Sequence, residues 1–328
     1  MSSTPVLEVS GLNVSFPAPH GKMMRRKGRI SVVRDVDLFV GHGETLGLVG
    51  ESGSGKSTVA RALMRLVEPA GGSVRLKGRE ITGLSRKALR AARRDIQMVF
   101  QDPYSSLDPS MLIADSVGEP LEVHDGLRGR ARDERVRELL ELVGLGAHHL
   151  ERYPAEFSGG QRQRIAIARA LALNPSVLIC DEAVSALDVS TQNQIIALLE
   201  RLRAELGLGY LFISHDLAVV KHISHRVAVM YFGRIVEVGT TEDIFDRPAH
   251  PYTQALLSAV AEPDPVVQRS RRFEPLRGEI PDVSNPPPGC AFASRCLRST
   301  DRCRTETPHL APQGEDHTVA CHHPLIAS

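Results

Sequence analysis

The nine residues 50–58 read Gly50-Glu-Ser-Gly-Ser-Gly-Lys56-Ser57-Thr58 and fill every fixed position of the Walker A pattern. An apolar segment at 45–49 precedes them, and a helical pattern at 56–67 follows. Glycines let such a loop wrap closely, so that backbone N–H groups and the helix N-terminus face phosphates. The complete match and its strand–loop–helix setting favour a phosphate-binding loop over an ordinary Gly-rich turn.

The side chains of this loop carry the chemistry that a nucleoside triphosphate needs. Lys56 is expected to reach the β- and γ-phosphates, and the Ser57 hydroxyl is expected to bind Mg²⁺. The predicted nucleotide-binding residues of the loop are Gly50, Glu51, Ser52, Gly53, Ser54, Gly55, Lys56, Ser57 and Thr58.

A second motif, Val177-Leu-Ile-Cys180-Asp181-Glu182, ends an apolar strand in two carboxylates. We assign Asp181 to the metal ion and Glu182 as the general base that polarises the attacking water. Alone the motif is weak evidence, because many strands end in a solvated acid. Beside a Walker A loop it becomes strong. Cys180 is expected to fill the buried face of the strand.

The third motif is Phe157-Ser-Gly-Gly-Gln161-Arg-Gln-Arg, followed by an apolar-periodic helix. Ser158, Gly159, Gly160 and Gln161 stand where that helix begins, which predicts a second anion site of backbone N–H groups. Only the first site has a Lys and a metal residue, so we infer that Ser158–Gln161 caps a nucleotide held by another subunit. A simple helix cap would leave the Ser-Gly-Gly-Gln run unexplained.

Strand and helix patterns alternate along most of the chain. Strands are predicted at 6–16, 36–40, 45–49, 96–100, 176–180 and 210–214, and helices at 56–67, 132–143, 191–206 and 217–223. The segments 226–231 and 234–238 resemble a hairpin. The succession predicts an α/β protein with a parallel, helix-flanked sheet. After about residue 240 the alternation fades, and prolines at 281 and 286–288 lead into a Cys-rich tail.

Composition limits the class of protein. The 328 residues carry 40 Lys+Arg against 39 Asp+Glu, which argues against a dedicated nucleic-acid binder. No apolar run approaches the roughly 18–20 residues that cross a bilayer, and residues 1–9 lack the features of a secretory signal. We therefore expect a cytosolic chain that reaches the membrane by docking on a partner. The basic segment 21–29 is interpreted as a solvated insertion rather than a headgroup-binding patch.

Together the three motifs resemble those of the ATP-binding-cassette (ABC) ATPases, in which the Ser-Gly-Gly-Gln signature shortly precedes the Walker B carboxylates. The resemblance implies an α/β fold with a RecA-like P-loop core, an antiparallel β subdomain and a helical signature subdomain. Gln101 resembles the Q-loop glutamine, which couples the metal and the water to the membrane partner. His215 resembles the switch histidine that contacts the γ-phosphate.

The resemblance implies further site residues. Asp188 ends a segment that resembles the D-loop, which crosses the interface between two cassettes, and Phe16 is the candidate for the aromatic ring that stacks on adenine. Mg²⁺ would be bound by Ser57, Gln101 and Asp181, and the catalytic side chains would be Glu182, His215 and Gln101.

Segments beyond the generic cassette narrow the resemblance. Residues 102–109, 181–188 and 250–257 are similar to those of oligopeptide/dipeptide importer ATPases. The insertion near Gly28 and the Ala183 after Glu182 resemble a subunit that pairs with a second, non-identical ATPase. We predict a cassette domain over 1–240, with its helical subdomain at about 102–160. A C-terminal extension would cover 241–328, with the four-cysteine tail at about 281–328.

The tail reads Cys290-x5-Cys296-x6-Cys303-x17-Cys321. These spacings are wider than zinc-ribbon knuckles and differ from common ferredoxin patterns, so chemistry alone predicts metal thiolates without naming the metal. Similar tails in some peptide-importer ATPases hold a [4Fe–4S] cluster, which is the leading hypothesis. Structural zinc and unmetallated thiols remain the alternatives. A bound metal would cross-link and stabilise a small, Pro-rich tail that lacks a hydrophobic core of its own.

The predicted function is hydrolysis of ATP, with Mg²⁺, to energise peptide import. The resemblance implies a second ATPase subunit, two integral membrane permease subunits and, indirectly, a solute-binding protein, at the cytoplasmic face of the membrane. Alternatives are a soluble ABC ATPase of DNA repair or translation, which usually has two cassettes or a coiled-coil insertion, and an importer ATPase for nickel or another small solute. A P-loop kinase would not explain Ser158–Gln161.

Overall fold

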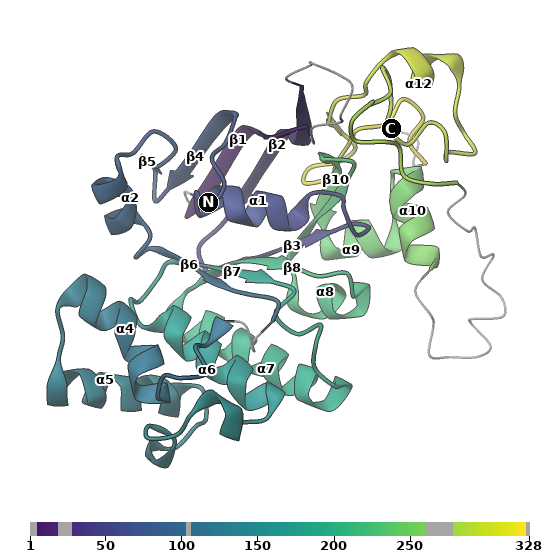
Figure 1. The fold of residues 1–328 in the computed structure, drawn as a ribbon. Coiled ribbons are helices and arrows are strands. Elements are labelled where there is room, and N and C mark those ends of the chain that lie inside the picture. The colour runs from purple at the N-terminus through teal and green to yellow at the C-terminus, as the bar shows by residue number, and fades with distance from the viewer. Residues whose placement is uncertain (1–4, 19–27, 103–105, 260–277, 326–328) are drawn as a thin grey trace. The chain divides into compact units, whose positions relative to one another are not determined.

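The computed structural model describes residues 5–18, 28–102, 106–259 and 278–325 (Figure 1). They fall into two compact units, each assembled from separate stretches of the chain. Unit 1 takes in the described residues within 1–8, 39–45 and 74–214, and unit 2 takes in those within 9–38, 46–73 and 215–328. The Walker A loop and the Cys-rich tail therefore belong to unit 2, and the Walker B carboxylates and the signature belong to unit 1.

Three parallel strands form the centre of unit 1. They are β6 (Ile96–Val99), β7 (Val177–Asp181) and β8 (Gly209–Ile213), with β7 between the other two. Every residue of β7 and β8 is buried. Continuous apolar runs are typical of parallel strands that are covered on both faces, and these two strands confirm the prediction.

Helices make up much of the rest of unit 1. Three of them, α4 (Ile113–Asp125), α5 (Gly129–Leu142) and α6 (Gly159–Leu171), pack against one another (Figure 1). In α5 the apolar face that the sequence predicts is buried. The remaining elements of this unit are α2 (Arg86–Ala92), the 3₁₀ turns η1 (Ala147–His149) and η2 (Pro154–Glu156), α7 (Val189–Leu206) and the short strand β5 (Arg79–Glu80), which pairs with the end of β4 (Gly71–Leu76).

Unit 2 combines parallel and antiparallel pairing. The buried strand β3 (Thr45–Val49) runs parallel to β9 (Arg226–Tyr231), and β9 forms a hairpin with β10 (Arg234–Thr240), as the sequence predicts. Helix α1 (Lys56–Leu63) follows the Walker A loop, and α8 (Leu217–Ile223) precedes β9. Strands β1 (Leu7–Pro17) and β2 (Arg29–Val40) are neighbours in a separate sheet.

The C-terminal part of unit 2 contains short elements that the fading alternation did not predict. They are α9 (Thr241–Asp246), α10 (Pro251–Ser258), α12 (Asp301–Thr305), β11 (Ala311–Pro312) and β12 (Thr318–Val319). Strand β12 pairs antiparallel with β10, so that Glu237 is opposite Val319. The tail is therefore part of the same sheet as β3, β9 and β10.

Two predicted boundaries differ from the structure by four residues or more. Helix α1 ends at Leu63 instead of residue 67, because Arg65 has a φ of 48° and helical residues require a negative φ. Strand β2 begins at Arg29, seven residues before the predicted start. Most of the basic segment 21–29 and residues 103–105 lie outside the described residues. The mixed α/β class is confirmed, whereas the predicted domain limits stay predictions.

Candidate active site

The Walker A loop of unit 2 depends on glycine at two positions. Gly50 has a φ of 150°, and a Cβ there would lie 2.1 Å from the carbonyl oxygen of Met230. Gly55 has a φ of 109° and a Cβ there would lie 3.1 Å from the Val32 carbonyl oxygen. Only glycine combines this conformation with so close an approach of neighbouring backbone. Gly55 is also the N-cap of α1, so the positive end of the helix dipole lies at the loop.

Lys56 lies almost completely buried against this loop, with 5% of its surface exposed. Its Nζ donates hydrogen bonds to the carbonyl oxygens of Gly50 at 2.7 Å and Glu51 at 2.9 Å. The ammonium group is therefore positioned by the loop itself. Ser57 and Thr58 follow in the first turn of α1 and are half-buried.

Two of the predicted catalytic side chains meet in unit 1. The Gln101 amide Nε2, beyond the end of β6, donates a hydrogen bond of 2.7 Å to Glu182 Oε2. Glu182 directly follows β7 and has a φ of 51°, a left-handed conformation that is uncommon outside glycine. Its amide donates to the Ile213 carbonyl oxygen at 2.9 Å, which ties the turn to β8. Asp181, the last residue of β7, is 5% exposed.

The signature residues form a capping box at the start of α6. Ser158 Oγ accepts the Gln161 N–H at 3.3 Å, and Gln161 Oε1 accepts the Ser158 N–H at 3.0 Å. A Cβ at Gly160 would lie 2.3 Å from Thr191 Cγ2. Capping and close packing therefore account for Ser158, Gly160 and Gln161. Our expectation that a simple cap would leave the run unexplained was wrong.

The remaining predicted residues are Asp188, His215 and Phe16. Asp188 is the N-cap of α7, where Oδ1 accepts the Thr191 N–H at 3.0 Å and Oδ2 accepts its hydroxyl at 2.7 Å. These hydrogen bonds lower the pKa of Asp188. His215 in unit 2 is exposed shortly before α8. Phe16, near the end of β1, is 38% exposed.

Known proteins match this chain closely. The family model described as "ABC transporter" matches residues 33–185, and the model "Oligopeptide/dipeptide transporter, C-terminal region" matches residues 236–303. A probable peptide ABC transporter ATP-binding protein of Sinorhizobium fredii is 52% identical over 320 residues, covering 98% of this chain and 90% of the relative. The oligopeptide transport ATP-binding protein AppF of Bacillus subtilis is 48% identical and covers 97% of both chains. The chain belongs to the oligopeptide/dipeptide family of ABC transporter ATP-binding proteins.

The structural comparison confirms the ABC cassette fold. A dimeric post-hydrolysis structure of the ATP-binding cassette MJ0796, bound to ADP and Pi, matches with a TM-score of 0.63 at 29% identity. The match covers 72% of this ABC ATPase and 98% of that chain. Among the described residues of this ABC ATPase, no helix is both long and apolar enough to span a bilayer.

Sequence reasoning missed a set of residues that contact the Walker A loop. Arg295 Nη1 and Nη2, from the Cys-rich tail, donate to the two carboxylate oxygens of Glu51 at 2.7 and 3.0 Å. The Tyr252 hydroxyl accepts the Glu51 N–H at 2.8 Å. Tyr252 stands in the family-like segment 250–257, but nothing in the sequence marks Arg295, which is 244 positions from Glu51.

The four tail cysteines of the ABC ATPase do come together. Cys290, Cys296, Cys303 and Cys321 line one small cavity with His322 and His323. Burial raises the pKa of the Cys290 and Cys296 thiols and raises that of Cys321 to about 11. Across the described ranges, however, no three Cys, His, Asp or Glu side chains are grouped to hold one metal ion.

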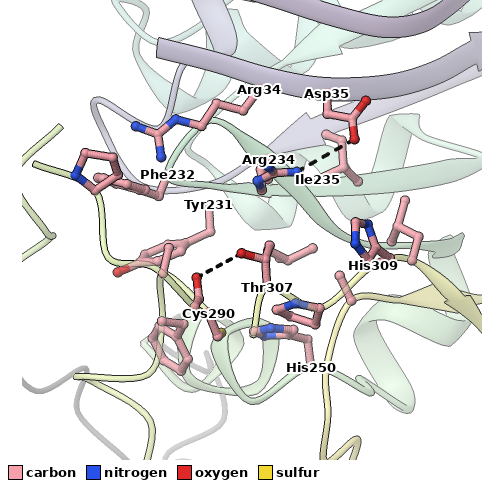
Figure 2. A pocket seen from close by; sticks show the side chains of 18 of the residues that line it. Arg34, Asp35, Tyr231, Phe232, Arg234, Ile235, His250, Cys290, Thr307 and His309 are labelled. Atoms are coloured by element: carbon pink, nitrogen blue, oxygen red, sulfur yellow. Dashed lines mark hydrogen bonds and ion pairs between the residues drawn. The ribbon is translucent and has the colours of Figure 1, made fainter. Parts of the chain in front are cut away.

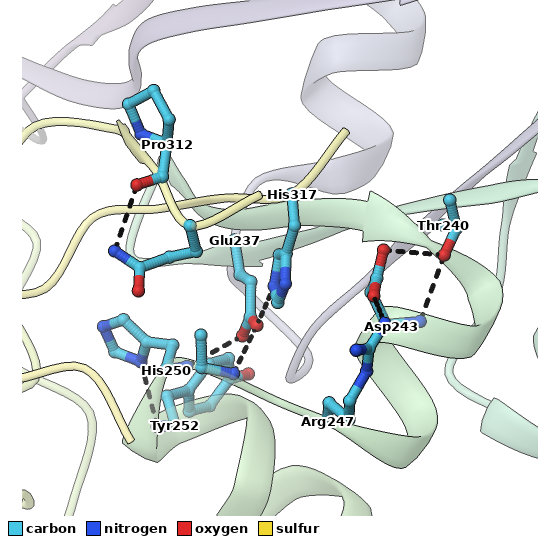
Figure 3. Close-up of polar contacts among 10 residues, drawn as sticks. Glu237, Thr240, Asp243, Arg247, His250, Tyr252, Pro312 and His317 are labelled. Carbon is cyan, nitrogen blue, oxygen red and sulfur yellow. Dashed lines mark hydrogen bonds and ion pairs between the residues drawn. The ribbon is translucent and has the colours of Figure 1, made fainter. Parts of the chain in front are cut away.

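A buried polar network joins the tail to β10 (Figure 3). Glu237 is fully buried, and its carboxylate contacts His317 Nε2 at 2.7 Å. The same carboxylate accepts the N–H groups of Ala249 at 2.6 Å and His250 at 3.0 Å. Next to it, His250 Nδ1 accepts the Tyr252 N–H at 2.9 Å, which fixes the neutral tautomer with its proton on Nε2.

A larger cavity of about 350 Å³ lies beside β9 and β10 in unit 2 (Figure 2). On its wall, Arg34 lies 4.6 Å from the centre of the Phe232 ring, and Arg234 lies 3.8 Å from Asp35. Burial and the neighbouring Arg234 lower the pKa of Arg34. None of the predicted nucleotide-binding residues lines this cavity.

Proposed function

We propose that this ABC ATPase binds and hydrolyses ATP to energise import of oligopeptides or dipeptides. The observation that carries the proposal is the geometry of the Walker A loop, where Gly50 and Gly55 hold positive φ and Lys56 lies against the loop carbonyls. Peptide cargo is supported by the names of relatives that are about 50% identical over nearly the whole chain.

The chemistry follows from the side chains. N–H groups of residues 50–58 and the start of α1 bind the phosphates, and Lys56 neutralises their charge. Ser57, Asp181 and Gln101 would hold Mg²⁺, which would offset the negative charge of the phosphates, and His215 would contact the γ-phosphate. Glu182 accepts a proton from the attacking water, while the Gln101 amide orients the carboxylate. Phe16 stacks on the adenine ring.

A complete site requires a second cassette. We assign Ser158, Gly159, Gly160 and Gln161 to a nucleotide held by a partner ATPase, and Asp188 to the interface. Ser158 is exposed, and the positive end of the α6 dipole lies beside it. Ser158 can therefore cap α6 and also face a phosphate of the partner's nucleotide. Binding of ATP then shifts the equilibrium from separate cassettes towards a closed dimer, and hydrolysis allows the two cassettes to separate again.

Partners and location complete the proposal. Two integral membrane permease subunits would receive the conformational change, with a solute-binding protein delivering the peptide outside. The ABC ATPase would work at the cytoplasmic face of the membrane. Its cassette is assigned to residues 1–240 and its extension to 241–328, which is supported by family matches at 33–185 and 236–303. Within the cassette we assign a RecA-like subdomain, an antiparallel β subdomain and a helical subdomain.

For the cysteine cavity we propose a [4Fe–4S] cluster, with zinc as the alternative. Four thiolates on one zinc ion, at Zn–S distances of about 2.3 Å, form a tight tetrahedron around a single point. A [4Fe–4S] cluster spreads four thiolates over four irons, and four cysteines line this cavity. The Sγ atoms of Cys296 and Cys321 accept backbone N–H groups at 3.4 Å, and these hydrogen bonds favour the thiolate form against the burial that raises both pKa values.

Metal analysis tests the cysteine assignment. Protein purified without oxygen should contain iron and sulfide, and replacing Cys290 and Cys303 by Ser should remove both. Cys180→Ser is the matched control, because this fifth cysteine is buried in β7 of unit 1, whereas the tail belongs to unit 2. Zinc in place of iron would select the alternative, and protein free of both metals would exclude metal binding.

Hydrolysis is tested with Glu182→Gln, which should retain ATP binding and stop turnover. Glu151→Gln, an exposed carboxylate of unit 1 with no assigned role, is the control and should leave both unchanged. An unchanged hydrolysis rate in Glu182→Gln would overturn the assignment of the base.

Transport is tested by co-purification and uptake. Recovery with integral membrane proteins, and ATP-dependent uptake of a labelled dipeptide by membrane vesicles that contain them, would support the proposal. Association with ribosomes or DNA would refute it. Uptake of nickel but not of peptide would support an importer and would show that the proposed peptide cargo is wrong.

A further inference from the structure

Arg295 lies between two of the tail cysteines in sequence, yet its side chain leaves the tail and ends at the Walker A loop. Only 5% of the Arg295 side chain and 22% of the Glu51 side chain is exposed. The two parallel hydrogen bonds, at 2.7 and 3.0 Å, match the planar fork of guanidinium to both carboxylate oxygens. The hydrogen bonds that Arg295 donates to the Glu51 carboxylate raise the pKa of Arg295, so the guanidinium stays charged.

The backbone of Glu51 is held as well. The Tyr252 hydroxyl accepts its N–H at 2.8 Å, and Tyr252 is fully buried. Its ring lies 4.6 Å from that of Tyr231 and 5.5 Å from that of the tail residue Phe292. Phe292 and Arg295 are three positions apart, so one short segment of tail supplies both the aromatic support and the salt bridge. Glu51 is thus fixed at its side chain and its main chain by residues outside the loop.

The charge of Glu51 gives this arrangement a consequence for nucleotide binding. A carboxylate inside a phosphate-binding loop repels the ligand unless a cation neutralises it. Because only 22% of the Glu51 side chain is exposed, solvent screens its charge only in part. Arg295 supplies the compensating charge, and Lys56 remains directed at the loop carbonyls.

We propose that Arg295 is a positioning residue for nucleotide binding, which holds Glu51 and thereby the Walker A loop in its phosphate-binding form and cancels the negative charge of Glu51. The proposal rests on the proposed function only in that this loop binds ATP. It makes the Cys-rich tail a part of the nucleotide site, acting through the loop and without touching the phosphates.

The first test measures binding of a fluorescent ATP analogue to the full-length Arg295→Met variant. Affinity should fall by roughly 10- to 100-fold, the size of effect expected when a remote change misplaces binding groups by about 1 Å. KM for ATP should rise by a similar factor, with kcat changed much less, because the loop can still be ordered by saturating ATP. The control is Arg302→Met, which breaks an exposed salt bridge to Glu306 within the same tail and should leave binding unchanged.

A double-mutant cycle separates positioning from general destabilisation. In a Glu51→Gln background the carboxylate charge is absent, so Arg295→Met should weaken binding by less than about threefold. An equal loss of affinity in both backgrounds would overturn the proposal. If Arg295→Met fails to fold, Arg295→Lys keeps the charge without the fork and should bind ATP more weakly than the native chain, whereas native affinity would refute the proposal. A native chain that binds no ATP would refute the proposed function instead.

Discussion

Gly50 is the residue whose replacement has the most direct steric consequence. A Cβ there would meet the Met230 carbonyl oxygen at 2.1 Å, and backbone cannot rotate away as a side chain can. We therefore expect Gly50→Ala to abolish measurable ATP binding, because the loop and β9 must separate. Binding of the fluorescent analogue and thermal unfolding of the purified variant would check this.

Gly53→Ala is the matched control for that variant. Gly53 has a φ of 78°, but no atom lies within 4 Å of its would-be Cβ. Only the left-handed conformation is then penalised, at about 1–2 kcal/mol. A Gly50→Ala protein that binds ATP as well as Gly53→Ala would contradict the steric argument.

His250 makes stability depend on pH. Burial lowers its pKa to about 4, although the nearby Glu237 carboxylate opposes the shift. The unfolded chain takes up this proton near pH 6.5, and the folded protein does not until about pH 4. Stability from this group is therefore complete above pH 6.5 and falls between pH 6.5 and 4, by about 3 kcal/mol in total.

Substitution of His250 isolates this effect. In His250→Asn, the amide oxygen can still accept the Tyr252 N–H at the start of α10, but the side chain no longer titrates. Denaturant unfolding at pH 7 and pH 4.5 should give a smaller loss of stability for this variant than for the native chain. His222→Asn, at an exposed histidine, should keep the native pH dependence. Identical profiles for all three proteins would disprove the assignment.

At the scale of elements, the start of α6 combines a structural and a proposed functional role. Ser158→Ala removes the cap on the Gln161 N–H and should cost about 1 kcal/mol. That corresponds to a melting temperature about 2–4 °C lower. Ser158→Asn restores a capping oxygen and should recover the melting temperature. If Ser158 also contacts a nucleotide in a partner ATPase, Ser158→Asn should still lose ATPase activity; full activity would limit Ser158 to the cap.

Element prediction from sequence worked where the pattern was long or continuous. Strands β7 and β8 are buried on both faces, which requires a continuous apolar run in the sequence. Helix α5 is buried on one face, which requires apolar residues at helical spacing. Both patterns can be recognised in a short stretch of sequence. Strand β12 has two residues and exists because β10 pairs with it, which no local pattern encodes. Helices α9, α10 and α12 have five to eight residues, too few for a clear period.

In the candidate site, too, local motifs could be predicted and contacts between distant parts of the sequence could not. Motifs with fixed spacing indicated the Walker A loop, the Walker B carboxylates and the signature, and the structure brings the Gln101 amide to the Glu182 carboxylate. Arg295 was missed because a salt bridge across 244 positions leaves no trace in spacing. The cap formed by Ser158 and Gln161 was undervalued, although its Ser-x-x-Gln pattern is a recognised capping signal.

For the molecule as a whole, the tail should behave as part of the ATPase. Deleting residues 279–328 removes Arg295 from Glu51 and His317 from the buried Glu237. We expect the shortened chain to lose ATP affinity at least as strongly as Arg295→Met and to unfold at a lower temperature. Equilibrium binding and calorimetry would check both. A shortened chain with native affinity and stability would show that the tail is an independent appendage.

The pairing of β10 with β12 also affects how the protein is made. Roughly eighty residues separate Val238 from its partner Thr318, so on a ribosome adding about 5–20 residues per second β10 waits about 4–16 s for its neighbour. During that interval its outer N–H and C=O groups are unpaired and can associate with other chains. Yield of soluble protein should therefore depend on how quickly the final segment is translated, and codons that slow the ribosome after residue 240 should favour inclusion bodies.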